Sequence, residues 1–351
     1  MAYFLGIIGT AKTSYAAVAD DNGEIIKVIK APPLSFRVNP NIKHCLLITI
    51  EELCNQLNLN FGAFKKELKC SCFAISGIIF DSDVNIFESF LEQIGFWDNS
   101  PIIICEDVHA HLAANLINVG GVIIAGTGSN IFFHINETAK PIRIDGWGSD
   151  LGDYGSGYFL GKLCLQSIFQ GLDGRIDRSE KLEWRILKHL NLLNVEDLYQ
   201  WFYSSRDTIN WRSDISDLSI PLISAAEKDK DPLSITIVNL GIEALQKSLD
   251  AAISKSRPVN SKRANSFPII LEGGVFENSM MYRKSFQKKI IQYNKEGNNC
   301  SVVFPKYLPI VGSLALAISK NTFINSSNEL FEPLERSAKS LGLAFNSKEG
   351  K

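Results

Sequence analysis

Two glycine-rich stretches of this chain have the residue types that bind a polyphosphate. Gly126-Thr127-Gly128-Ser129 follows the apolar run 121–125, and a second glycine cluster lies within 146–157. A glycine turn after a buried strand lets backbone N–H groups approach phosphate oxygens, because no Cβ blocks them and positive φ angles are accessible. Thr127 and Ser129 add hydroxyl donors. A lone Gly-Thr-Gly-Ser also serves in ordinary turns, but the second cluster favours the phosphate site.

Two adjacent carboxylates could act on a substrate of such a site. Glu106 and Asp107 directly follow the apolar run 102–105. Phosphoryl transfer to a hydroxyl needs a carboxylate that takes the hydroxyl proton at in-line geometry. Both acids could equally begin a helix, where the helix dipole stabilises negative charge.

The composition limits the kinds of partner. The chain has 351 residues, of which 45% are hydrophobic, and this length is typical of two domains. Its 36 basic and 38 acidic residues leave a net charge of -2, so a nucleic-acid partner is not expected. The start of the chain has no basic leader, and no apolar run approaches the roughly 20 residues that span a bilayer. We therefore expect a cytoplasmic protein without a membrane partner.

The cysteines give a weak signal for a metal. There are seven, scattered mainly through apolar segments, which predicts reduced core thiols. Cys70 and Cys72 form the only close pair, and alternation along a strand places both on one face. Without a second pair this is a poor zinc or iron–sulfur motif, so metal ligands are left unassigned.

The elements that must position these residues occur in two similar sets, each opening with three strands. In the first half we expect strands at 3–8, 15–19, 25–29, 72–75 and 102–105, and helices at 42–57, 85–91 and 110–116. In the second half we expect strands at 121–125, 131–135, 142–144, 268–271 and 301–304, and helices at 156–169, 279–293 and 313–319. Tight turns are expected at 20–23 and 136–138. This repetition indicates an α/β protein with two similar domains that face a cleft.

The domain boundaries follow from the repetition. The first domain is expected at 1–118 and the second at 119–320, with a tail at 321–351 that packs back on the first domain. Within the second domain, about 180–262 is helical and nearly strandless, which is typical of an insertion.

Several motifs in order resemble one known family. After Gly126-Thr127-Gly128-Ser129 come Gly146-Trp147-Gly148, Gly152-Asp153-Tyr154-Gly155-Ser156, Gly273-Gly274-Val275-Phe276, and finally Pro309 with Gly312. This set resembles the N-acetylglucosamine kinases and, more broadly, the BadF/BadG/BcrA/BcrD-type ATPases of the actin-like sugar kinase superfamily. The resemblance implies two ribonuclease-H-like domains around a central nucleotide and sugar cleft. It also implies ATP and Mg²⁺ as cofactors, an amino sugar as acceptor, and a homodimer.

The resemblance assigns roles to individual residues. It makes Asp107 the catalytic base, ahead of its neighbour Glu106, and a contact of the sugar. It assigns the contacts with sugar hydroxyls to Gly146, Trp147 and Asp153, and it makes the tryptophan a buried wall of the pocket. It also places Ser76 near the N-acetyl group. The ATP contacts that it implies are Gly126, Thr127, Gly128 and Ser129 on the phosphates, and Gly273, Gly274 and Val275 beside the adenosine.

The chain also departs from the family pattern. Ile8 stands where the first phosphate loop normally has an aspartate near Mg²⁺, while Gly9, Thr10, Lys12 and Thr13 still offer phosphate donors. Asp145 replaces the first glycine of Gly-Gly-Trp-Gly, and Tyr154 replaces a glutamate. The sugar-binding asparagine of the family has three competing positions here, which are Arg37, Asn39 and Asn41.

These departures leave two kinds of function open. The leading hypothesis is an ATP-dependent kinase of an amino sugar such as N-acetylglucosamine or glucosamine. The alternatives are a degenerate kinase that senses ATP and sugar without efficient transfer, and a BadF-type ATPase that carries an iron–sulfur cluster on dedicated cysteines.

Overall fold

The chain folds into two compact units. A computed structural model describes residues 2–96, 100–136, 139–206, 208, 210–260, 266–297, 299–320 and 329–345, with only the backbone at 257–260. Unit 1 consists of Met1–Asn118 and Pro305–Lys351, and unit 2 of Val119–Phe304. Each unit contains one five-stranded sheet with helices, which confirms the predicted α/β class.

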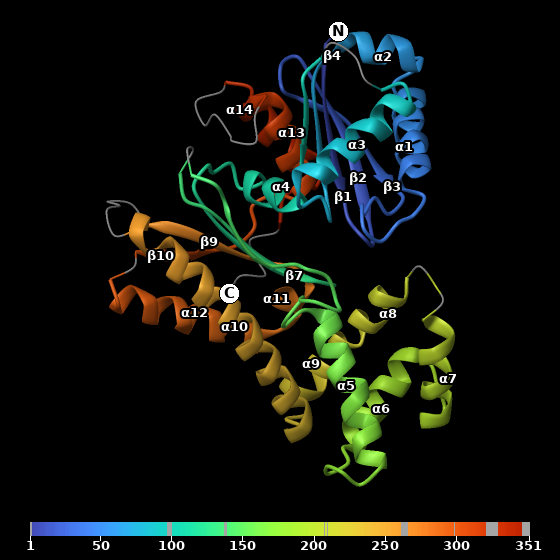
Figure 1. Ribbon diagram of the computed structural model, residues 1–351, viewed down its shortest axis with the longest axis vertical. Helices are drawn as coiled ribbons and strands as arrows, with labels where there is room; N and C mark the ends of the chain where they lie inside the picture. The colour runs from blue at the N-terminus through green and yellow to red at the C-terminus, as the bar shows by residue number, and fades with distance from the viewer. Residues whose placement is uncertain are drawn as a thin grey trace. The chain divides into compact units, whose positions relative to one another are not determined.

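The sheet of unit 1 has the strand order β3-β2-β1-β4-β5. Its strands are β1 (Tyr3–Gly9), β2 (Ser14–Asp20), β3 (Ile25–Ala31), β4 (Leu68–Ile75) and β5 (Ile102–Cys105). The first three form an antiparallel meander, and β4 and β5 run parallel to β1. The central strand β1 is buried along its whole length, because helices cover both faces of the sheet (Figure 1).

The two faces of this sheet carry separate apolar cores. On one side lie α1 (Ile42–Gln56), α2 (Phe61–Glu67) and α3 (Asp81–Gln93), packed on side chains such as Leu5 and Ile7. On the other side lie α4 (Asp107–Ala113), α13 (Pro309–Ser319) and α14 (Phe331–Ser340). Cys70 and Cys72 both face this second core, as the alternation predicted, and burial raises the pKa of the Cys70 thiol to about 11.

The predicted end of the second domain is wrong, because α13 packs in unit 1. A Cβ on Gly6 of β1 would lie 2.8 Å from the Leu314 nitrogen, and one on Gly312 would lie 1.9 Å from the Ala110 oxygen. Glycine at both positions therefore lets β1 and α4 approach α13 closely. The helix α13 is far from the N-terminal strands in the sequence, yet it packs on their sheet, and no local sequence pattern reveals this. In Figure 1 it lies beside the blue strands.

Unit 2 repeats the sheet of unit 1 with the strand order β10-β9-β6-β7-β8. Its strands are β6 (Gly120–Ala125), β7 (Ser129–His134), β8 (Ile142–Asp145), β9 (Phe267–Glu272) and β10 (Cys300–Val303). Again a three-strand antiparallel meander is followed by two strands parallel to the first. The duplication predicted from the sequence is thereby confirmed, although part of the expected turn at 136–138 lies outside the described residues.

Helices pack on this second sheet and extend away from it. They are α5 (Gly157–Leu172), α6 (Glu180–Leu190), α7 (Val195–Ser205), α8 (Trp211–Asp217), α9 (Ser219–Glu227), α10 (Pro232–Asn260), α11 (Gly274–Asn278) and α12 (Met280–Lys295). The expected insertion is thus helical through residue 260. Among the described residues, no helix has the length and apolar character needed to cross a membrane.

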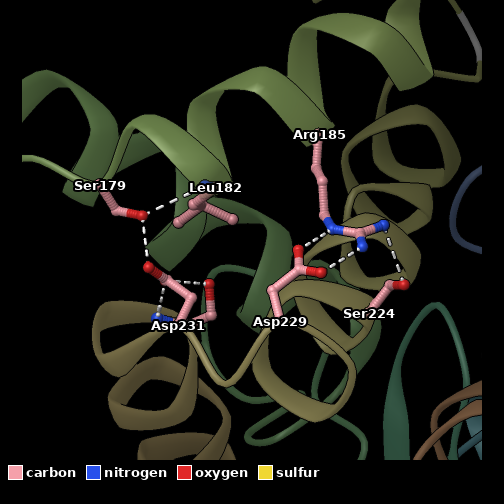
Figure 2. Close-up of polar contacts among 7 residues, drawn as sticks. Ser179, Leu182, Arg185, Ser224, Asp229 and Asp231 are labelled. Atoms are coloured by element: carbon pink, nitrogen blue, oxygen red, sulfur yellow. Dashed lines mark hydrogen bonds and ion pairs between the residues drawn. The ribbon is translucent and has the colours of Figure 1, made fainter.

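Polar contacts fix the helices of the insertion to one another (Figure 2). Arg185 of α6 forms a two-pronged ion pair with Asp229, and its Nη1 donates to the Ser224 hydroxyl at 3.1 Å. Asp231 accepts from the Ser179 hydroxyl at 2.6 Å and from the N–H of Ser234 at 2.8 Å. These contacts join the start of α6 to the start of α10, so the insertion has a defined internal geometry.

Candidate functional site

The Gly126–Ser129 turn of unit 2 connects β6 to β7 and is anchored on the start of α5. The N–H groups of Gly157 and Tyr158 donate to the carbonyls of Gly126 and Thr127 at 2.7 and 3.2 Å. A Cβ added at Gly126 would meet nothing within 4 Å, so this glycine has open space beside it. A fixed glycine turn with an open side is the geometry that phosphate contacts require.

The carboxylate of Asp153 lies against this turn. The Ser129 N–H donates to Asp153 Oδ1 at 3.3 Å, and a Cβ on Gly128 would lie 2.9 Å from Asp153 Oδ2. Burial, with Asp145 close by, raises the pKa of Asp153 to about 6, against the lowering effect of the Ser129 N–H and nearby arginines. Asp153 is therefore a carboxylate that titrates close to neutral pH beside the predicted phosphate turn.

Asp145 organises the second glycine cluster, a role that the sequence reasoning missed. This aspartate is 6% exposed. Its Oδ1 accepts the N–H groups of Gly146 and Asp153, both at 2.8 Å, and its Oδ2 accepts the Tyr154 N–H at 3.0 Å. A Cβ on Gly152 would lie 2.3 Å from the same Oδ1, so glycine is required there. The signal in the sequence was the aspartate in place of the family's glycine.

Trp147 stands on the surface of unit 2 and rests on an arginine. Its side chain is 49% exposed, so the expectation of a buried tryptophan is wrong. Arg143 Cζ lies 4.6 Å from the centroid of the Trp147 ring, and Arg143 Nη2 donates to the Gly146 carbonyl at 2.7 Å. The cation holds the ring and the turn together, and an exposed indole face is suited to contact a sugar ring.

The glycine turn that follows β9, at Gly273, lies beside the Gly126–Ser129 turn that follows β6. Gly273 has a φ of 105°, and a Cβ there would lie 2.6 Å from the Ala125 oxygen. Gly274 begins α11, where a Cβ would meet only the Asn278 side chain, at 4.0 Å, whereas Val275 is 2% exposed and belongs to the core. Gly126 and Gly273 therefore follow adjacent parallel strands, at one edge of the sheet.

In unit 1 the corresponding turn, after β1, is closed by its own hydroxyl groups. Thr10 Oγ1 donates to the Thr13 carbonyl at 2.8 Å and accepts the N–H groups of Thr13 and Lys12 at 3.1 and 3.3 Å. Ser14 Oγ accepts the Thr10 N–H at 3.1 Å. The Thr10 hydroxyl, predicted as a phosphate donor, thus holds the shape of the turn.

Ile8 lies inside the protein rather than on the phosphate turn. The side chain is 2% exposed and packs in the core that α13 covers. An apolar residue in this place completes the packing, and it cannot hold a metal-bound water.

Three predicted residues of unit 1 lie at the same edge of its sheet. Gly9 is the last residue of β1, and Ser76 and Asp107 come just after β4 and β5. These strands are adjacent and parallel, so their carboxyl ends lie together. The Ser76 N–H donates to the Gly9 carbonyl at 2.8 Å. Asp107 is the first residue of α4, which starts three residues before the predicted helix. This grouping is the structural observation that favours a catalytic Asp107.

The described part of the chain contains no dedicated metal-binding site. Among those residues, no group of three or more His, Cys, Asp or Glu side chains could hold a metal ion. All seven cysteines are free thiols, and six of them are buried. The dedicated cysteine set that a bridging iron–sulfur cluster needs is therefore not seen there.

Comparison with known proteins agrees with the motifs. Residues 5–317 match the sequence model of the BadF/BadG/BcrA/BcrD ATPase family. The chain is 27% identical over 290 residues to an N-acetylmuramic acid/N-acetylglucosamine kinase of Clostridium acetobutylicum, covering 82% of this chain and 90% of the relative. It is 25% identical over 330 residues to an N-acetyl-D-glucosamine kinase of Dictyostelium discoideum, covering 90% of this chain and 98% of the relative.

Solved structures show the same fold. A proposed N-acetylglucosamine kinase from Chromobacterium violaceum superposes with a TM-score of 0.68 at 19% identity, over 90% of this chain and 99% of the other. A ROK family glucokinase from Streptomyces griseus, in complex with glucose and AMPPNP, gives a TM-score of 0.51 at 15% identity, with the same coverage of 90% and 99%. These structures confirm the fold, and the family match over residues 5–317 confirms the resemblance predicted from the motifs.

Proposed function

The chain belongs to the BadF/BadG/BcrA/BcrD ATPase family, and on this premise we propose that it phosphorylates a hydroxyl group of an amino sugar with ATP. N-acetylglucosamine and glucosamine are the acceptors that fit the proposal. The relatives from Clostridium acetobutylicum and Dictyostelium discoideum are named as kinases of such sugars. The observation that carries the proposal is the position of Asp107 beside Ser76 and the Gly9 turn, at the carboxyl ends of three parallel strands.

The proposed reaction is an in-line displacement at the γ-phosphorus of ATP. Asp107 takes the proton of the attacking hydroxyl while the new O–P bond forms and the bond to the bridging oxygen of ADP breaks. The Gly126–Ser129 turn supplies donors to the phosphates, and Gly273 and Gly274 let the backbone approach the nucleoside. Ionised Asp153 accepts sugar hydroxyls, with Gly146 and Trp147 forming the adjoining surface.

Mg²⁺ enters this proposal as part of the MgATP substrate. With ATP it is held mainly by phosphate oxygens and water, and it neutralises their charge. The described residues offer no three-ligand metal group, and Ile8 replaces the family aspartate, so a dedicated metal centre does not fit. Chelation by EDTA should therefore stop turnover without lowering the thermal midpoint of the protein alone. The partners are small molecules, and the homodimer stays a prediction.

A second function is supported by the first phosphate turn. Ile8 is buried in the core and the Thr10 hydroxyl is bonded within its own turn, so this turn offers fewer groups to ATP than the family pattern does. A degenerate kinase that binds ATP and sugar as a sensor follows from this observation. The BadF-type ATPase with a cluster is the weaker alternative, and iron analysis of anaerobically purified protein tests it.

The deciding experiment measures ADP and sugar phosphate together. Protein with MgATP is assayed with N-acetylglucosamine, glucosamine, N-acetylmannosamine, glucose or no sugar. We expect sugar-dependent turnover that Asp107→Asn lowers by about 10²–10⁴-fold, the usual contribution of a general base. Glu106→Gln is the matched control and should retain most activity.

The other outcomes separate the hypotheses. ADP release at the same rate with and without sugar would indicate an ATPase. Calorimetric binding of ATP and sugar without product would indicate the sensor. Full activity of Asp107→Asn would remove Asp107 from its role, whatever the acceptor.

A further inference from the structure

Unit 2 contains a cavity of about 600 Å³ between the edge strand β8 and the helices α5 and α10. Its apolar wall consists of Ile144 from β8, Phe159 and Leu163 from α5, and Leu240 and Ala244 from α10. The volume falls within the roughly 300–1,000 Å³ that is typical of small-molecule sites. None of these five side chains belongs to the proposed ATP or sugar site, so the cavity has no role in the proposed reaction.

Tyr154, which stands where the family has a glutamate, forms the wall of the cavity next to the phosphate turn. Its ring centroid lies 5.9 Å from that of Phe159, and its carbonyl accepts the Ser129 hydroxyl at 2.9 Å. A Cβ on the next residue, Gly155, would lie 2.4 Å from the Gly241 carbonyl, so this loop sits directly on α10. Close packing on α10 therefore fixes this wall of the cavity.

Three polar side chains of α10 also line the cavity. Within the part of the chain that the structure describes, Glu243 and Lys247 form no ion pair and Ser248 forms no side-chain hydrogen bond. Ser248 is only 8% exposed, so its hydroxyl is accessible from the cavity. Glu243 and Lys247 are four residues apart on the helix, a spacing at which Cβ atoms lie about 5–6 Å from each other. A carboxylate and an ammonium group thus stand side by side at the edge of an apolar cavity.

We propose that this cavity binds a free amino acid with a large apolar side chain. The apolar side chain packs against the wall, the α-ammonium group pairs with Glu243, and the α-carboxylate pairs with Lys247 and the Ser248 hydroxyl. A ligand with a single charge would leave one of the two charged side chains without its pair, and a sugar would place hydroxyl groups against apolar walls. The inference goes beyond the proposed function and does not rest on it, because binding here needs neither ATP nor sugar.

The test measures binding of L-phenylalanine to the full chain by calorimetry, without ATP or sugar. Three analogues each lack one feature of this probe: 3-phenylpropionate lacks the ammonium group, phenethylamine lacks the carboxylate, and L-serine lacks the apolar side chain. Glu243→Gln and Lys247→Gln remove the matching charges of the protein. Glu196→Gln is the matched control, since Glu196 is an exposed glutamate of α7 in the same unit. Thermal unfolding verifies that each variant folds.

We expect wild type to bind L-phenylalanine at least about fivefold more tightly than each analogue, which corresponds to the upper range of a solvent-exposed ion pair. Glu243→Gln should remove the difference between L-phenylalanine and 3-phenylpropionate, and Lys247→Gln the difference between L-phenylalanine and phenethylamine. Glu196→Gln should bind all four compounds as wild type does. Equal binding of L-phenylalanine and its singly charged analogues by wild type, or unchanged differences in Glu243→Gln and Lys247→Gln, would overturn the inference.

A second copy of the chain is the competing occupant of this cavity. Leu240 lines the cavity and is 48% exposed, so Leu240→Asp tests both occupants. We expect this change to weaken binding of L-phenylalanine at least about tenfold and to leave the molar mass in light scattering unchanged. If wild type does not bind L-phenylalanine, the inference fails. A dimer that Leu240→Asp dissociates would then assign the cavity to an interface between copies. Neither measurement needs phosphoryl transfer, so the result is independent of the kinase assay.

Discussion

The glycine turns after β1 and β6 occupy equivalent places in two sheets of the same strand order, yet they are held differently. In unit 2 the Gly126 turn is fixed from outside, by the start of α5 and by the N–H of Ser129 on Asp153. In unit 1 the hydroxyls of Thr10 and Ser14 bond within the turn, and the Leu34 N–H adds a bond to the Thr10 carbonyl at 3.1 Å. Strand order thus determines where a turn lies, while the side chains around it determine what it can bind.

This difference divides the chemistry between the units. The turn of unit 2 has an open glycine and a carboxylate that titrates near pH 6, which suits phosphate and hydroxyl contacts. Unit 1 contributes Asp107 and Ser76 from its strand ends rather than from its first turn. We therefore expect substitutions around the turn of unit 2 to affect activity more than those in the turn of unit 1.

Among the substitutions around the two turns, the largest effect is expected from Asp145→Ala. It removes the acceptor of three backbone N–H groups, and each buried donor left unsatisfied costs about 1–3 kcal/mol. We expect the free energy of unfolding to fall by about 3 kcal/mol, and kcat/KM by about a hundredfold because Asp153 loses its position. Denaturant unfolding and initial rates measure both. Asp173→Ala, an exposed aspartate, is the control, and wild-type rates in Asp145→Ala would refute the positioning role.

Gly126→Ala should come next, and it tests phosphate contact without disturbing the fold. The added Cβ meets nothing within 4 Å, so the thermal midpoint should stay unchanged. A methyl group between the turn and the phosphates should raise the KM for ATP about tenfold, equivalent to about 1.4 kcal/mol. Gly62→Ala in α2 is the control, since its Cβ would make an ordinary contact at 3.5 Å. An unchanged KM would place ATP elsewhere.

The pH dependence follows from Asp153. Its pKa of about 6 in the folded protein lies above the ordinary 3.8, so the carboxylate is protonated below pH 6. We expect kcat/KM for the sugar to fall about tenfold per pH unit below pH 6. This decrease should be absent in Asp153→Asn. Because the folded state binds this proton more tightly, the contribution of Asp153 to stability should decrease as pH rises from about 4 to 6. If kcat/KM of Asp153→Asn still decreased below pH 6, another titrating group would be responsible.

The smallest effect is expected from Thr10→Val in unit 1. It removes the hydroxyl that donates to the Thr13 carbonyl and accepts the N–H groups of Thr13 and Lys12. Because this turn is partly exposed to water, the change should cost only about 1 kcal/mol of stability. We expect a two- to threefold rise in the KM for ATP, since this hydroxyl shapes the turn rather than binding phosphate. Thr236→Val, which removes a similar hydroxyl bond on α10, is the control. A rise as large as that of Gly126→Ala would show that the two turns bind ATP alike.

The sequence by itself determined the elements and their duplication. Apolar alternation and tight turns are local features, so the two strand meanders and the turns at Gly9, Gly126 and Gly273 could be predicted. The place of Asp107 after β5 followed from the same local reasoning, together with the family resemblance. The shared face of Cys70 and Cys72 needed only the two-residue period of a strand.

Only the tertiary structure decided which distant residues meet. Assignment of α13 to unit 1 depends on close contacts of Gly6 and Gly312 with segments far away in the chain. The Asp145 carboxylate accepts hydrogen bonds from backbone N–H groups up to nine residues away in the chain. Side-chain hydrogen bonds and close packing join residues across the fold, so the chain's local periodicity does not encode them.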